Sequence, residues 1–112
     1  MEFLWLNYLP LALVTPHVTM IVSFGSKETR LIWEGQPVNN YMMDFMEVVR
    51  QRLYVLHRSD SLMQLSEIPS HRLEKLKGNF QEYYSIRVNR QWRIIFKWEK
   101  GNAYDVELID YH

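Results

Sequence analysis

The last third of the chain, residues 71–112, alternates between apolar and polar positions over several short segments. A period of two is typical of β-strands that bury one face. The alternating segments are residues 72–76, 83–88, 92–98 and 104–109, and they are separated by Gly78, by Asn89-Arg90 and by Lys100-Gly101-Asn102. The last two separators have the composition of tight hairpin turns. We therefore expect a mostly antiparallel, twisted sheet of about four strands.

One face of this sheet carries most of the large apolar side chains. These are Trp92, Ile94, Phe96 and Trp98, followed by Tyr104, Val106 and Leu108. The same alternation places Arg87, Arg93 and Lys97 on the opposite face or at its edges. We expect helices to cover the apolar face and the basic face to remain open.

Apolar residues before the sheet follow a helical spacing instead. Met42, Phe45, Val49, Leu53 and Leu56 recur every three or four residues, which predicts an amphipathic helix capped by Asn39 or Asn40. A shorter helix is expected from a Ser26 cap to about Trp33. The β-branched run Met20–Phe24 predicts a strand before it. The pattern indicates an α+β protein with two N-terminal helices packed on one face of the sheet.

Shorter features connect the long helix to the sheet. Ser61 and Gln64 have the spacing of a capping box and predict one short helical turn. Residues 68–70 are expected to form a loop. His57, near the end of the long helix, is expected to be a surface or dipole-paired histidine rather than a metal ligand, because no second ligand-type residue lies at a useful helical offset.

Residues 1–19 differ from the rest of the chain. The apolar stretch within them is interrupted by Pro10 and is shorter than the roughly 20 residues that a membrane-spanning helix needs. Glu2 stands where a signal peptide carries positive charge. We expect an apolar extension upstream of a functional start at Met20. A membrane anchor or an oligomerisation arm are the alternatives.

Composition limits the chemistry further. The 112 residues predict one main domain, residues 20–112, and the absence of cysteine excludes disulfides and thiol catalysis and is compatible with a cytoplasmic protein. The formal net charge is zero, yet the segment from Arg72 to Lys100 holds eight basic and three acidic residues. Such a segment can form a phosphate-binding patch, although a solvated sheet face is the simpler alternative.

No Gly-rich phosphate loop, HExxH or G-x-S-x-G motif is present, and what remains is a basic and aromatic sheet face with a terminal histidine. Metal-independent RNA cleavage is one reaction that such a face could support. That reaction needs a base for the 2′-hydroxyl, a cation for the phosphate and an acid for the leaving 5′ oxygen. Arg93 suits the phosphate because a guanidinium binds it bidentately. His112 suits the base or the acid. Tyr83 or Tyr111 could stack on a nucleobase.

Three segments carry a resemblance to a known family. RLEKLKG at 72–78, YSIRVNRQWRIIF at 84–96 and AYDVELIDYH at 103–112 resemble the C-terminal half of HigB-type toxins. These toxins, also known as plasmid maintenance killer proteins, belong to the RelE/ParE superfamily of type II toxin–antitoxin systems. The MIVSF run at Met20 is similar to the start of that family. The resemblance covers residues 20–112.

The resemblance implies a small RelE-like fold and a ribosome-dependent mRNA endonuclease that inhibits translation. The sheet would hold mRNA in the ribosomal A site, and cleavage by 2′-hydroxyl attack would need no metal and no cofactor. The implied partner is a HigA-like helix-turn-helix antitoxin, through which alone the toxin would reach operator DNA. No contact with a membrane is implied.

Carried over residue by residue, the resemblance assigns catalytic positions to Arg93, Lys77 and the closing Asp110, Tyr111 and His112. Some family members have a histidine three residues before the lysine, where this chain has Glu74, a carboxylate that could act as the base. The expected RNA-binding residues are Arg72, Lys75, Tyr83, Arg87 and Lys97. Two alternatives remain open: a non-enzymatic, ParE-like inhibitor of DNA gyrase, and an inactive module that only binds the antitoxin.

Overall fold

The computed structural model describes residues 21–39 and 41–111, which form an α+β fold with one antiparallel sheet. The strands follow one another in chain order as β1 (Glu74–Lys75), β2 (Tyr84–Arg87), β3 (Trp92–Glu99) and β4 (Asn102–Asp110). The helices are α2 (Lys27–Trp33), α3 (Met43–Arg58) and α4 (Leu62–Ser66), with short 3-10 turns η1 (Pro69–His71) and η2 (Gly78–Phe80). This confirms the predicted fold class and the four-stranded sheet.

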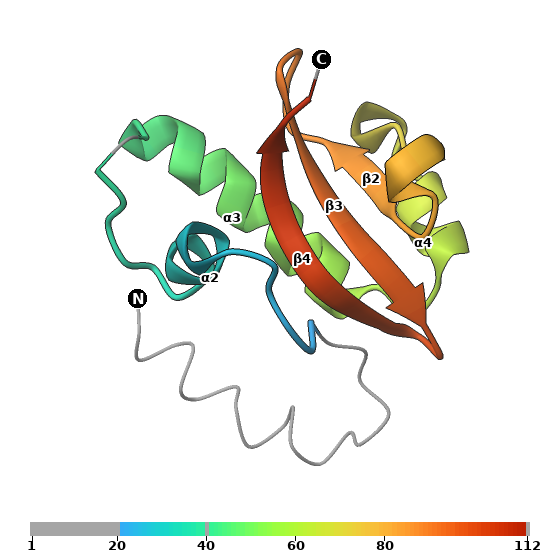
Figure 1. Cartoon of the computed structure of the whole chain (residues 1–112). Helices are drawn as coiled ribbons and strands as arrows, with labels where there is room; N and C mark the ends of the chain where they lie inside the picture. Colours follow the sequence, from blue (N-terminus) through green and yellow to red (C-terminus); the bar gives the residue numbers. More distant parts are fainter. Residues whose placement is uncertain (1–20, 40, 112) are drawn as a thin grey trace.

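The longest helix, α3, passes behind β3 and β4 and covers the apolar face of the sheet (Figure 1). Ile94 and Phe96 of β3 are fully buried, as are Val49, Leu53 and Leu56 of α3, and all five belong to one core cluster. The apolar face that the alternation predicted for β3 therefore packs against the apolar stripe that the three-to-four spacing predicted for α3. Trp92 and Trp98 pack at the border of this cluster, as the alternation predicted.

The prediction for the start of the long helix was wrong. The structure places its N-cap at Met42, which provides no capping side chain, instead of at Asn39 or Asn40. Because Met42 lies in extended backbone before the helix, it leaves the apolar stripe and is 78% exposed. Met46, one turn further along the helix, is buried in the core. The helix of α2, by contrast, begins as predicted, since Ser26 Oγ accepts a hydrogen bond from the Thr29 backbone at 3.2 Å.

The first strand of the sheet is shorter than its alternating sequence predicted. Only Glu74 and Lys75 pair with β2. Arg72 has a positive φ of 45° and caps η1, so the chain turns there and cannot continue as a strand. The segment expected as a loop around Pro69 is this 3-10 turn. The short helix after Ser61 forms as predicted, with Ser61 Oγ accepting from the Gln64 backbone at 3.2 Å.

A β-bulge interrupts β4 at Asp105. The register pairs Ile95 with Glu107 but Lys97 with Tyr104, so one residue of β3 faces two of β4. Asp105 has a positive φ of 50°, and the bulge shifts the alternation by one position. Ala103 is consequently in the core, whereas Tyr104, which the sequence pattern placed there, is not part of the cluster.

The segment that precedes α2 runs beside β4 as two isolated parallel bridges, Ile21 with Ala103 and Phe24 with Val106. A continuous strand over Met20–Phe24 was expected, and Met20 lies outside the described residues. The bulge explains the interruption: the Asp105 backbone N–H donates to Ser23 Oγ at 2.9 Å instead of joining a regular ladder. The expectation for residues 1–19 also lies outside the described part of the chain.

His57 was predicted to be a surface or dipole-paired histidine, and the structure corrects the first of these alternatives, because the residue is partly buried in the last turn of α3. Its Nδ1 accepts a hydrogen bond from the Ile21 backbone at 3.2 Å, and its ring lies 5.1 Å from that of Trp33. Burial, and secondarily the charge of Arg58, lowers the pKa of His57 below its usual value. The histidine thus fastens the segment around Ile21 to α3. None of the helices in residues 21–39 and 41–111 has the length and apolar character needed to cross a membrane.

Candidate functional site

Arg93 is held rigidly on the face of the sheet opposite the helices. Its Nε donates to Ser85 Oγ at 2.8 Å, and its Nη2 donates to the Arg72 carbonyl at 2.8 Å. The Arg93 side chain is only 13% exposed. Ser85 is small and fully buried on the neighbouring strand β2, which leaves room for the guanidinium to lie across it. Two anchored nitrogens fix the orientation of a group that would otherwise have several rotamers.

A carboxylate and an aromatic ring complete the surroundings of this guanidinium. Glu74 Oε1 of β1 lies 3.6 Å from Arg93 Nη2, and the Arg93 guanidinium carbon lies 5.6 Å from the centre of the Tyr111 ring. We refer to Arg93, Arg72, Glu74, Ser85 and Tyr111 together as the Arg93 cluster. The cluster joins residues from β1, β2, β3 and both chain segments that flank the sheet.

Opposing effects act on the charge of Arg93. Burial lowers the pKa of its guanidinium, the charges of Glu74 and Tyr111 raise it, and Arg87 and Arg72 lower it again. An arginine remains protonated at neutral pH in spite of such effects, because its ordinary pKa lies far above neutral. The cluster therefore presents a fixed positive charge beside a carboxylate that is 51% exposed.

Arg87 is the direct cross-strand partner of Arg93 in the β2–β3 ladder. Its Nε donates to the Asn89 carbonyl at 3.1 Å, which turns the side chain toward the hairpin. Arg72 and Arg87 were both expected to contact RNA, and the structure brings both beside Arg93. Two guanidinium groups next to a third repel one another unless an anion lies between them.

The residues before the C-terminus are tied to the β2–β3 hairpin. Gln91 Nε2 donates to Asp110 Oδ2 at 2.9 Å, and the Tyr111 backbone N–H donates to the Gln91 carbonyl at 2.8 Å. These two hydrogen bonds hold the Tyr111 ring beside the Arg93 guanidinium. His112 lies outside the described residues, so its predicted catalytic role stays a prediction. Tyr111 belongs to the Arg93 cluster and Asp110 precedes it in the chain, and the catalytic roles that the resemblance assigns to both stay predictions.

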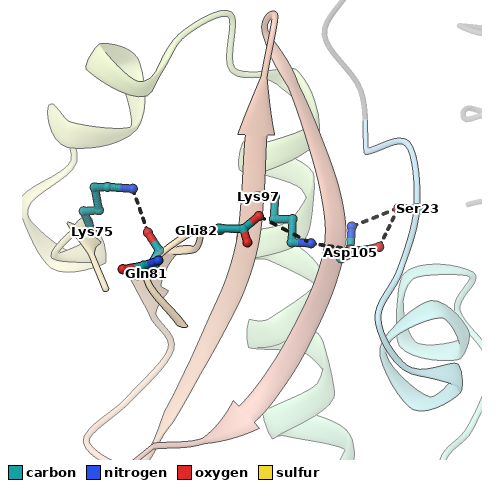
Figure 2. A network of polar contacts seen from close by, with 6 residues as sticks. All are labelled: Ser23, Lys75, Gln81, Glu82, Lys97 and Asp105. Atoms are coloured by element: carbon teal, nitrogen blue, oxygen red, sulfur yellow. Dashed lines mark hydrogen bonds and ion pairs between the residues drawn. The ribbon is translucent and has the colours of Figure 1, made fainter. Parts of the chain in front are cut away.

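The other predicted site residues are distributed differently. Lys77 is exposed and lies immediately before η2, and no contact within residues 21–39 and 41–111 joins it to the Arg93 cluster. Lys97 lies four residues along β3 from Arg93, which is about 13 Å if each residue of a strand advances by about 3.3 Å. Lys75 pairs with Tyr84 at the start of β2, and Tyr83 directly precedes that strand. Figure 2 shows the polar contacts at that end of the sheet.

The positive charge of Lys97 is balanced within that group. Its Nζ lies 3.4 Å from Asp105 Oδ2 and 3.9 Å from Glu82 Oε1 (Figure 2). The same Nζ lies 5.4 Å from the centre of the Tyr83 ring. The hydrogen bond to Asp105 is the main cause that raises the pKa of Lys97. Lys75 Nζ donates to the Gln81 carbonyl at 2.9 Å. Two carboxylates already neutralise Lys97, so it is less suited to bind phosphate than Arg87.

The sequence pattern missed two residues that shape the site. Ser85 accepts a hydrogen bond from Arg93, and Gln91 donates one to Asp110 and so fixes the segment around Tyr111. A small polar residue in an otherwise apolar or basic strand is the signal that could have identified Ser85. No three His, Asp or Glu side chains are grouped as a metal site would require anywhere in the described ranges. The cluster as it stands offers a cation for a phosphate, an adjacent base and an aromatic surface.

Comparison with known proteins gives three kinds of match. A profile of the HigB-like toxins, described as "RelE-like toxin of type II toxin-antitoxin system HigB", matches residues 34–112. The "Endoribonuclease HigB" of Proteus vulgaris is 30% identical over 93 residues, covering 83% of this chain and 100% of that protein. The "Toxin HigB-1" of Vibrio cholerae is 38% identical over 90 residues, covering 80% of this chain and 95% of that protein.

Solved structures agree on the fold. The YoeB–YefM complex from Staphylococcus aureus contains a chain that superposes with a TM-score of 0.55 at 20% identity, covering 84% of this chain and 99% of that one. A heterotetrameric complex of the same toxin and antitoxin gives the same TM-score at 19% identity, with the same coverage. At this level of identity the similarity concerns the arrangement of the sheet and helices.

Proposed function

The chain belongs to the HigB-like family of RelE-like toxins from type II toxin–antitoxin systems, and from this premise we propose that it is an endoribonuclease that cleaves mRNA on the ribosome. The observation that carries the proposal is the Arg93 cluster. It combines an anchored guanidinium with a carboxylate 3.6 Å away and a tyrosine ring, all on the face that the helices leave uncovered. The names of the two relatives, one an endoribonuclease and the other a toxin, support the same class of activity.

The proposed reaction begins at the 2′-hydroxyl of the nucleotide before the scissile bond. Glu74 accepts the 2′-hydroxyl proton, the 2′ oxygen attacks the adjacent phosphorus, and the bond from phosphorus to the 5′ oxygen breaks. The products are a 2′,3′-cyclic phosphate and a 5′-hydroxyl, so no water, metal or cofactor takes part. Arg93 stabilises the negative charge that accumulates on the phosphate oxygens in the transition state.

The remaining roles in this reaction follow from position and resemblance. His112 protonates the leaving 5′ oxygen, since an imidazole titrates close to neutral pH. Tyr111, already stacked against Arg93, limits the movement of the guanidinium and offers a surface for a nucleobase. Asp110 keeps this C-terminal segment in place through Gln91. Lys77 contributes positive charge near the RNA once the substrate is bound.

The proposed biological setting is that of a toxin controlled by a partner. A HigA-like helix-turn-helix antitoxin would neutralise the toxin and would connect it to operator DNA. The YoeB–YefM toxin–antitoxin complex, which contains a chain of the same fold, supports the expectation of such a partner. Translating ribosomes would supply the mRNA in the A site, in the cytoplasm. Cleavage there would stop translation and arrest growth.

The experiment is a cleavage assay with purified, antitoxin-free protein, ribosomes and a translated mRNA, followed by mapping of the new 5′ ends. We expect cleavage in the coding region with wild-type protein and none with Arg93→Ala. Uncut mRNA with wild-type protein would refute the proposal. Inhibition of DNA gyrase supercoiling by that same preparation would identify a ParE-like inhibitor, and growth without arrest on induction would identify an inactive antitoxin-binding module.

A further inference from the structure

A basic depression lies next to the Arg93 cluster, between η1 and the β2–β3 hairpin. Its volume is about 540 Å³, and it is lined by Pro69, Ser70 and Arg72 on one side and by residues 87–90 on the other. Three of its seven lining residues are arginines, namely Arg72, Arg87 and Arg90, and none is acidic. The remaining lining is polar or apolar and uncharged.

Several other cations among the described residues are paired with carboxylates. Arg30 pairs with Glu34, Arg50 pairs with Glu47, and Lys97 lies between two carboxylates. The three arginines of the depression are Arg72, Arg87 and Arg90. By contrast, none of them forms an ion pair with a carboxylate within residues 21–39 and 41–111.

A fourth arginine adds to the positive charge from below. Arg52 of α3 donates from its Nε to the Arg87 carbonyl at 3.2 Å. Arginines gathered around one depression repel one another, and a bound anion would relieve that repulsion. The depression therefore has the charge of an anion site for which residues 21–39 and 41–111 supply no paired carboxylate.

Two contacts link the depression to the proposed catalytic arginine. The Arg72 carbonyl accepts the hydrogen bond from Arg93 Nη2, and Arg87 is the cross-strand partner of Arg93. Directly opposed residues of an antiparallel pair lie about 5 Å apart at their Cα atoms. Their side chains can thus reach different phosphates of one strand of RNA.

We propose that this depression binds a backbone phosphate of the substrate RNA, next to the phosphate that Arg93 holds. Arg87 and Arg90 contact the phosphate oxygens, and Arg72 closes the site from η1. The proposal rests on the function proposed above. It adds a second anchoring point for the RNA strand, which sets the register of the scissile bond relative to Arg93 and Glu74.

The test compares Arg87→Gln and Arg90→Gln with the wild type. Arg30→Gln is the matched control, because it removes the same charge from α2, away from the depression. Binding is measured to ribosomes programmed with an mRNA that carries 2′-O-methyl groups across the A-site codon and is therefore uncleavable. We expect Arg90→Gln to weaken binding about 3- to 10-fold and to reduce the slope of log K against log salt by about 1.

A second arm identifies the source of the phosphate. Methylphosphonates, which are uncharged, replace the mRNA phosphates one at a time on either side of the scissile position. One such replacement should weaken binding of the wild type as much as Arg90→Gln does, and should add nothing to that variant. Weakened binding without any such coupling would place the contact on another RNA and overturn the proposal.

Two other outcomes are equally informative. Identical binding of Arg90→Gln and Arg30→Gln would overturn the proposed subsite while leaving the proposed endonuclease intact, because cleavage by the wild type is scored separately. A wild type that binds with this coupling but does not cleave would remove the proposed reaction and retain the subsite. Arg90 has no hydrogen bond or ion pair among the described residues, so Arg90→Gln tests binding without loss of a structural contact. Arg87→Gln loses the hydrogen bond to the Asn89 carbonyl, and its thermal unfolding shows whether that loss destabilises the fold.

Discussion

Glu74 Oε1 lies 3.6 Å from Nη2 of Arg93, on the face of the sheet that the helices leave open. Glu74 is the first residue of β1, the shortest strand, and it faces a guanidinium that Ser85 Oγ and the Arg72 carbonyl already hold in place. A carboxylate in this position can do two things: neutralise the arginine before RNA binds, and accept a proton from a hydroxyl held beside the phosphate. The first is a contact in the free protein, and the second is a proposal for the complex.

The role proposed for Glu74 predicts that Glu74→Gln lowers the cleavage rate by about 10²- to 10⁴-fold, the usual contribution of a general base. Glu74→His should retain much of the activity, because an imidazole can accept the same proton. Single-turnover cleavage of ribosome-bound mRNA measures both. Full activity in Glu74→Gln would show that the carboxylate only balances the charge of Arg93. Since Glu74 is half exposed and its bond to Arg93 is long, we expect neither variant to unfold.

Arg93 should not be replaceable by lysine. Arg93→Lys keeps the charge but cannot bind Ser85, the Arg72 carbonyl and a phosphate at the same time, because a lysine ammonium lacks the planar fork of a guanidinium. We expect a loss of about 10²- to 10³-fold in the cleavage rate, which is the cost of removing one aligned donor from a transition state. Arg58→Lys, at the exposed end of α3, is the matched control and should cleave normally. Normal cleavage by both variants would mean that charge alone suffices at position 93.

Two methionines of the same region should differ sharply in their effect on stability. Met46 is 7% exposed and belongs to the core, whereas Met42 is 78% exposed. Met46→Ala should lower the free energy of unfolding by about 2–5 kcal/mol, the range for truncation of a buried methionine. Met42→Ala should change it by less than about 0.5 kcal/mol. Urea denaturation of the two variants measures the difference, and equal effects would contradict the helix start at Met43.

The buried His71 should make the fold sensitive to acid. It is 2% exposed, its Nδ1 has no hydrogen-bond partner among the described residues, and burial, aided by the charge of Arg52, lowers its pKa. With a folded-state pKa below the unfolded value of about 6.5, the unfolded chain binds the proton first. Stability is therefore complete above pH 6.5 and falls as the pH decreases toward the folded pKa.

The variant His71→Leu tests this behaviour. Its free energy of unfolding should fall less between pH 7.5 and pH 5.5 than that of the wild type, because a leucine has no proton to bind. The free energy of unfolding of His71→Leu should still depend on pH, because the variant retains the carboxylates and His57, whose pKa is also lowered. Guanidinium chloride denaturation at both values of pH gives the two differences. An unchanged difference in His71→Leu would show that His71 does not contribute.

The sequence by itself determined most of the elements and the order in which the strands of the sheet follow one another. The period of two fixed which residues of β3 face the core, the three-to-four spacing fixed the stripe from Val49 to Leu56, and Lys100-Gly101 fixed the second hairpin through the positive φ that both residues adopt. These are local properties, because the period and the turn geometry depend on neighbouring residues only. Arg93 was identified from its position in the strand and from the resemblance of residues 84–96 to HigB-type toxins.

Only the tertiary structure decided which residues meet at the site. Glu74, Ser85, Arg93 and Tyr111 are far apart in the chain, and they converge because β1, β2 and β3 pair in one register and Gln91 holds the C-terminal segment. The ion pair between Lys97 and Asp105 depends on a bulge in β4 that no local pattern predicted. Strand register and bulges are set by long-range pairing and packing, and so the periodicity of a single segment does not contain them.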